Sequence, residues 1–174
     1  MNTCLPRRAF NDVHTHIHPV ALEDMRRIMD AAGIERVVNL GVLEARSIPF
    51  DQGMRAFWSV LGERMVYFPT PEFSDLTPGF GERMADALER KVEAGAAGLK
   101  IFKELGLRHR DSVGQLIAVD DPRLDPLWAR AGTLGVPVLI HTADPKAFFE
   151  PLDPTNERWE ELQAHPDWHF GRAV

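Results

Sequence analysis

Four glycines recur at the same place in a repeated pattern, and this repeat limits the folds open to the chain. Gly33, Gly62, Gly95 and Gly135 each follow a segment with helical spacing and precede a short apolar run. A glycine directly after a helix adopts the left-handed cap conformation without steric cost, and a short β-branched run is typical of a buried parallel strand. The expected helices lie near residues 20–30, 47–61, 79–94 and 122–134.

A first strand around residues 10–17 brings the expected strands to five, with a helix between each pair. This alternation is typical of parallel α/β folds. A nucleotide-binding open sheet is disfavoured, because no G-x-G-x-x-G follows the first strand and no G-x-x-x-x-G-K-[ST] occurs. We therefore expect an α/β fold of the TIM-barrel (β/α)8 type, in which a long loop at residues 112–126 lines the active face.

The chain is short for such a barrel. A closed barrel takes about 250 residues, whereas five expected strands occupy nearly all of the 174 residues. We expect residues 1–174 to form a single domain, the N-terminal portion of an incomplete (β/α)8 barrel truncated to about five βα units. An open array exposes the edges of its outer strands, which favours self-association into a homo-oligomer.

Composition narrows the classes of partner. The hydrophobic share of 44% and the charged share of 26% are those of a folded globular protein. A formal net charge of −6 opposes binding to nucleic acid or anionic membranes, and no apolar run approaches the roughly 20 residues of a membrane helix. The single cysteine, Cys4, cannot form an internal disulfide. We expect a cytoplasmic protein whose partner is a small-molecule substrate.

The stretch NDVHTHIHP near the start places histidines on alternate residues. Residues two apart on a strand point the same way, so His14 and His16 share one side and can bind one cation. His18 continues the alternation but precedes Pro19, so we assign it to the start of the next helix or to a position behind the ligands. Asp12 either orients the pair or belongs to the strand's opening turn.

A third histidine follows the fifth expected strand in GVPVLIHTADP. Parallel strands deliver their carboxyl ends to one rim, so His14, His16 and His141 can meet there despite their distance in sequence. Taken alone, His141 is more simply a hydrogen-bonded rim residue. The H-x-H pair favours metal binding instead.

The fourth expected strand, in AAGLKIFKE, carries a lysine. Alternation places Lys100 and Phe102 on one face and the aliphatic Leu99 and Ile101 on the other, so Lys100 points into the barrel. A buried lysine is costly unless paired. Lys100 is our candidate catalytic residue, which binds a substrate carboxylate or stabilises negative charge; the alternative is a lysine that snorkels to the rim, where Lys103 is also expected.

These motifs together carry a family resemblance. D-x-H-x-H in the first strand and PVLIH in the fifth resemble the amidohydrolase superfamily of metal-dependent barrels. Within it, GLKIFKELGL and VDDPRLDPLWARAGTLGVPVLIHTADP are most similar to the amidohydrolase-related group that includes aminocarboxymuconate semialdehyde decarboxylase. An H-x-H motif also occurs near the start of histidinol-phosphatase-type phosphoesterases and TatD-type deoxyribonucleases. The histidine of the fifth strand, without a glutamate at the fourth, favours the amidohydrolases.

The resemblance implies a divalent metal, usually zinc, bound by His14, His16 and His141, which activates water for hydrolysis of a small organic substrate. Relatives also decarboxylate or hydrate such substrates, and binuclear members carboxylate a lysine at the position of Lys100. The family's further histidine after strand 6 and aspartate after strand 8 have no counterpart in this sequence. A catalytically incomplete metal-binding fragment is therefore the alternative, and other divalent ions suit imidazole as well.

Overall fold

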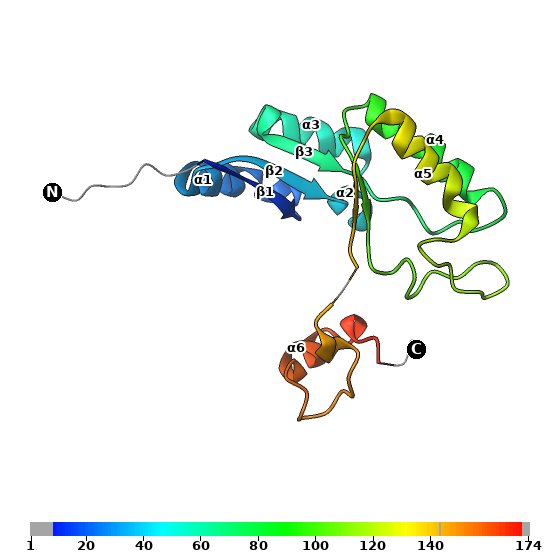
Figure 1. The fold of residues 1–174 in the computed structure, drawn as a ribbon. Coiled ribbons are helices and arrows are strands. Elements are labelled where there is room, and N and C mark those ends of the chain that lie inside the picture. Colours follow the sequence, from blue (N-terminus) through cyan, green and yellow to red (C-terminus); the bar gives the residue numbers. More distant parts are fainter. Residues whose placement is uncertain (1–8, 143, 172–174) are drawn as a thin grey trace.

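The computed structural model describes residues 9–142 and 144–171, so Cys4 lies outside the described residues. Helices and parallel strands alternate along the chain (Figure 1). The strands are β1 (Phe10–Thr15), β2 (Ile34–Leu40), β3 (Met65–Phe68), β4 (Leu99–Ile101) and β5 (Val138–Ile140). The helices are α1 (Leu22–Ala32), α2 (Val42–Ala45), α3 (Phe50–Leu61), α4 (Phe80–Glu93), α5 (Asp125–Leu134) and α6 (Trp159–Ala164).

The predicted helices correspond to α1, α3, α4 and α5, each within a few residues of its expected bounds. Gly33 shows why the repeat works: its φ of 78° is left-handed, and its N–H donates to the carbonyl of Met29 at 2.9 Å. That bond closes α1 and directs the chain into β2. The long loop between β4 and α5 is also confirmed, but its predicted end at residue 126 is wrong, because a 3₁₀ turn occupies Pro122–Leu124 and α5 begins at Asp125.

The strands form two parallel ladders that follow the chain order. One ladder has the order β1-β2-β3, and the other pairs β4 with β5. Two backbone hydrogen bonds join them, from Ala97 N–H to the Tyr67 carbonyl at 2.9 Å and from Lys100 N–H to the Pro69 carbonyl at 2.8 Å. The predicted α/β class with parallel strands is therefore confirmed.

Two clusters of buried side chains hold the helices against the strands. One joins α1 and α3 to β2 and β3 around Met29, Val37 and Phe57. The other joins α4 and α5 to β4, and it contains Leu99 and Ile101, the pair expected on this face. A small third cluster of Phe148, Leu162 and Phe170 lies in the segment that carries α6, and Leu107 of the loop after β4 packs against it.

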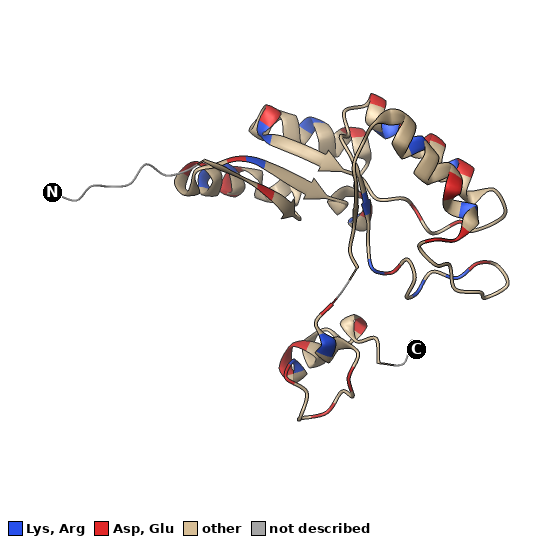
Figure 2. Cartoon of the chain, viewed as in Figure 1, with Lys and Arg blue, Asp and Glu red and all other residues tan. Residues whose placement is uncertain are grey.

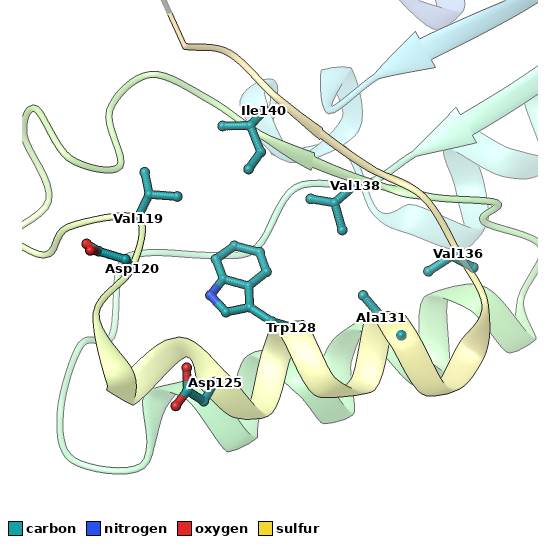
Figure 3. Close-up of a pocket in the computed structure, with 9 residues that line it drawn as sticks. Val119, Asp120, Asp125, Trp128, Ala131, Val136, Val138 and Ile140 are labelled. Carbon is teal, nitrogen blue, oxygen red and sulfur yellow. The ribbon is translucent and has the colours of Figure 1, made fainter.

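Several apolar side chains of the outer strands β1 and β5 are exposed. Phe10 and Val13 of β1 are 49% and 60% exposed, and Val138 and Ile140 of β5 are 38% and 37% exposed. Beside β5, an apolar cavity of about 670 Å³ opens against Trp128 of α5 (Figure 3). Acidic and basic residues are intermingled along the helices and loops (Figure 2). No helix in the described part of the chain is long and apolar enough to cross a membrane.

Candidate metal centre

His14 and His16 lie together at the carboxyl end of β1. Their ring centroids are 5.3 Å apart, and the rings meet edge to face at 71°. His14 belongs to β1, but the strand ends at Thr15, so the prediction that the strand continues to Ile17 is wrong. Asn39 explains the early end: its side chain accepts from Ile17 N–H at 2.7 Å and donates to the Ile17 carbonyl at 2.9 Å, in place of ladder bonds.

The ring of His16 is held in one orientation. Its Nδ1 lies 2.8 Å from the carbonyl oxygen of Leu40. Because a carbonyl can only accept, Nδ1 carries a proton, and in the neutral ring the lone pair is therefore on Nε2. Phe102 stacks on the ring, with centroids 5.8 Å apart. His16 therefore presents one nitrogen in the form that binds a metal.

The side chains of Asp12 and His18, which flank this pair, form hydrogen bonds with backbone N–H groups. Asp12 accepts a hydrogen bond from the backbone N–H of His14 at 3.0 Å, so its carboxylate belongs to the strand's turn and not to an imidazole. The Nδ1 of His18 accepts from Val20 N–H at 3.2 Å and caps the 3₁₀ turn at Pro19–Ala21. The assignment of His18 to the start of the next helix is thus confirmed.

Lys100 of β4 is fully buried. Its Nζ lies 5.1 Å from the ring centroid of Phe102 and has no hydrogen-bond partner among the described residues. Burial lowers the pKa of Lys100, and the carboxylate of Glu104 opposes this shift only in part. A buried amine without a partner is unfavourable for stability, which is typical of a group kept for a ligand.

His141 directly follows β5, and its N–H donates to the carbonyl of Ile101 at 3.0 Å. Its Nε2 lies 3.3 Å from Oδ1 of Asp144. The other carboxylate oxygen of Asp144 lies 2.9 Å from Nζ of Lys103. Lys103 in turn lies over the ring of Phe170, 4.8 Å from its centroid. The rim at β5 is therefore tied to the β4 loop and to the C-terminal segment.

The pKa of His14 responds to the charges of several of these groups. Burial lowers the pKa of His14 first, and the positive charges of Lys100, His16 and His141 lower it further. Lys100, His16 and His141 therefore each lie within electrostatic reach of His14. Even so, within residues 9–142 and 144–171, no three histidine, cysteine, aspartate or glutamate side chains are already grouped closely enough to hold a metal ion.

The donors nevertheless fit a divalent ion. Imidazole nitrogens are good ligands for zinc and for several other divalent metals. The lowered pKa of His14 favours the neutral ring, which is the form that coordinates. Because Asp144 contacts Nε2 of His141, coordination through that nitrogen competes with this contact. The assignment of three histidines to one metal stays a prediction.

Two residues of this rim were missed by sequence reasoning. Asp144 comes three residues after His141, and a carboxylate that close behind a strand-end histidine was a usable signal. Phe102 shares the face of Lys100 by simple alternation, but nothing in the sequence indicates that its ring stacks on His16. A cavity of about 670 Å³, lined by loops that follow β2, β3 and β4, opens beside Phe102.

A comparison with models of protein families gives a match to the chain. The family model described as amidohydrolase matches residues 69–170, which is more than half of the 174 residues. The matched range includes Lys100, His141 and Asp144, whereas His14 and His16 precede it. Neither a curated protein nor a solved structure matches the chain.

Proposed function

Because the chain belongs to the amidohydrolase family, we propose that it is a metal-dependent hydrolase that acts on a small organic substrate. His14, His16 and His141 bind one divalent ion, for which zinc is our first choice. The observation that carries this proposal is the paired imidazoles at the end of β1, one of which has its Nε2 lone pair fixed by the Leu40 carbonyl. When bound, such an ion lowers the pKa of a water molecule and polarises a substrate oxygen.

The chain's own residues supply the rest of the site. Lys100 donates a hydrogen bond from Nζ to a substrate oxygen that is negative or becomes so during the reaction, since this amine is buried without a partner. Phe102 stacks on one face of His16, a residue that is otherwise exposed, and lies beneath the buried Nζ of Lys100. A cavity lined by Phe102 and Glu104, but not by Lys100 or the three histidines, adjoins the site at Phe102 and is our candidate space for a substrate.

We further propose that residues 1–174 form a single domain, the first part of a (β/α)8 barrel. Two parallel ladders in chain order, joined by two backbone hydrogen bonds, support this arrangement, as do the exposed apolar side chains of β1 and β5. Those exposed edges are the surfaces through which a homo-oligomer would form. The protein is expected to act in the cytoplasm.

A second reaction, decarboxylation as in the aminocarboxymuconate semialdehyde decarboxylase group, is favoured by one observation. Burial lowers the pKa of Lys100 and the negative charge of Glu104 raises it only in part, so a substrate carboxylate that approached Nζ would stabilise the protonated amine. Such a group suits a substrate that carries a carboxylate. Carboxylation of Lys100 itself would instead serve a pair of metal ions.

The experiment is a zinc titration followed by turnover of an aryl ester, a lactone and an aromatic carboxylic acid. We expect one zinc per chain and zinc-dependent hydrolysis, both lost in His16→Ala and both kept in His18→Ala, whose histidine caps a turn. Release of carbon dioxide from the acid alone would identify a decarboxylase. Zinc binding without turnover would identify a metal-binding scaffold, and failure to bind zinc would overturn the proposal.

A further inference from the structure

Two buried side-chain atoms in the described part of the chain have no hydrogen-bond partner, and they are Nζ of Lys100 and Oδ2 of Asp144. Nearly all buried polar atoms in proteins are paired, so each exception asks for an explanation. The proposed reaction uses Lys100. It leaves Asp144 without a role.

The carboxylate of Asp144 is buried and has charged neighbours, but one of its oxygens accepts no hydrogen bond from the described residues. Its side chain is 8% exposed, and Oδ1 lies 3.3 Å from Nε2 of His141. Nζ of Lys103 approaches Oδ2 to 2.9 Å, yet the two atoms lack the alignment of a hydrogen bond. The pair is therefore electrostatic, and Oδ2 still has lone pairs for a donor.

This carboxylate lines a cavity of about 360 Å³ next to His141. The size falls within the range of small-molecule pockets, roughly 300 to 1,000 Å³. Its polar groups come from Lys103 and from the residues after β5, and its remaining walls are mostly apolar. The apolar walls are Leu105, Leu107, Val119, Ile140 and Phe149.

The charges in this cavity favour a ligand that carries a hydrogen-bond donor over a ligand that carries an anionic group. The charge of Lys103 is already balanced by Asp144, and Lys103 also faces the rings of Phe170 at 4.8 Å and Phe148 at 5.6 Å. An anionic ligand group would therefore meet the carboxylate of Asp144 without an unpaired cation to offset it. An N–H or O–H group would instead satisfy the unpartnered oxygen.

We propose that this cavity is a substrate subsite, in which Asp144 accepts a hydrogen bond from a hydroxyl, amine or amide N–H carried on an apolar body. The inference rests on the proposed function in one respect: the donor group of the substrate would lie next to His141, a proposed metal ligand. Binding in the subsite itself needs no metal. Asp144 thus selects among substrates by their hydrogen-bond donors.

The test compares two matched probes on the full chain in the presence of a chelator. NMR titration measures the affinity of 3-phenylpropan-1-ol and of its methyl ether, which lacks the donor. We expect the alcohol to bind about tenfold tighter, with shifts at Leu107 and Phe149. Asp144→Leu should reduce the alcohol to the affinity of the ether, whereas Asp120→Asn, at the cavity in Figure 3, should keep the difference.

Equal affinities in the unmodified chain would overturn the inference, and so would a difference that survives Asp144→Leu. If Asp144→Leu does not fold, Asp144→Asn preserves the side-chain shape. In that variant 3-phenylpropylamine, an ammonium ion, should bind about tenfold more weakly while the ether is unaffected. An unchanged amine affinity would refute a role for the carboxylate. Because no zinc is present, these outcomes are independent of the zinc titration.

Discussion

Replacing Lys100 with methionine should make the protein more stable. The side chain is fully buried, and its Nζ has no hydrogen-bond partner among the described residues. Removing a buried unsatisfied group recovers a desolvation cost of about 1 to 3 kcal/mol. The lost contact with the Phe102 ring offsets about 0.5 to 1 kcal/mol of this gain. We therefore expect Lys100→Met to raise the free energy of unfolding by about 0.5 to 2 kcal/mol.

Lys103→Met is the matched control, three residues along the same segment. Its ammonium lies 2.9 Å from a carboxylate oxygen of Asp144, which is 8% exposed. Removing the cation leaves that carboxylate buried with only part of its compensation. The same chemical change should therefore lower the free energy of unfolding by about 1 to 3 kcal/mol. The two variants are expected to differ in sign.

The pH dependence gives an independent readout of the same burial. The folded pKa of Lys100 is lowered from 10.5, so between the two values the unfolded chain binds more protons than the native chain. The free energy of unfolding therefore rises with pH across that window. Below the lowered pKa the amine is protonated in both states, and the full cost of burying its charge is present. Lys100→Met should lack this rise.

Urea unfolding followed by circular dichroism measures both effects, provided the denaturant slope is the same in each variant. The reasoning is refuted if Lys100→Met loses more than about 1 kcal/mol. It is also refuted if the variant keeps the alkaline rise in stability of the unmodified chain.

Three further variants test the frame around the histidines. Asn39→Ala removes both hydrogen bonds to the backbone of Ile17 and should cost about 2 to 4 kcal/mol in unfolding free energy; a melting temperature equal to that of the parent would contradict this role. Gly41→Ala combines a φ of 58° with a Cβ only 2.5 Å from the Phe102 ring, so it should destabilise by about 1 to 3 kcal/mol and shift the His16 ring resonances in NMR spectra. Tyr67→Phe removes two hydrogen bonds to α2, and urea unfolding should show a loss of about 1 to 3 kcal/mol, with no loss if those bonds are dispensable.

Local periodicity was enough to predict the helices and the parallel class of the strands. Glycines after helices and alternation within strands depend on neighbouring residues alone, and Gly33, Leu99 and Ile101 all behave as expected. The end of β1 depends on a distant residue. Asn39 lies 22 positions after Ile17, and its amide replaces the ladder there.

The candidate site divides in the same way. The common rim of parallel strands predicts which residues come near one another; Lys100 and His141 both lower the pKa of His14, but no three ligand side chains among the described residues are grouped closely enough to hold a metal ion. The choice of partners does not follow from topology. His141 contacts Asp144, and Asp144 contacts Lys103, through side-chain rotamers that a sequence pattern cannot specify.

The most direct test of the proposed metal site is a crystal structure of the chain with zinc, with diffraction data collected on both sides of the zinc absorption edge. We predict one anomalous peak per chain, about 2.0 to 2.1 Å from a ring nitrogen of each of His14, His16 and His141. A peak bound by His14 and His16 while His141 stays on Asp144, or no peak near β1, would contradict the three-histidine site.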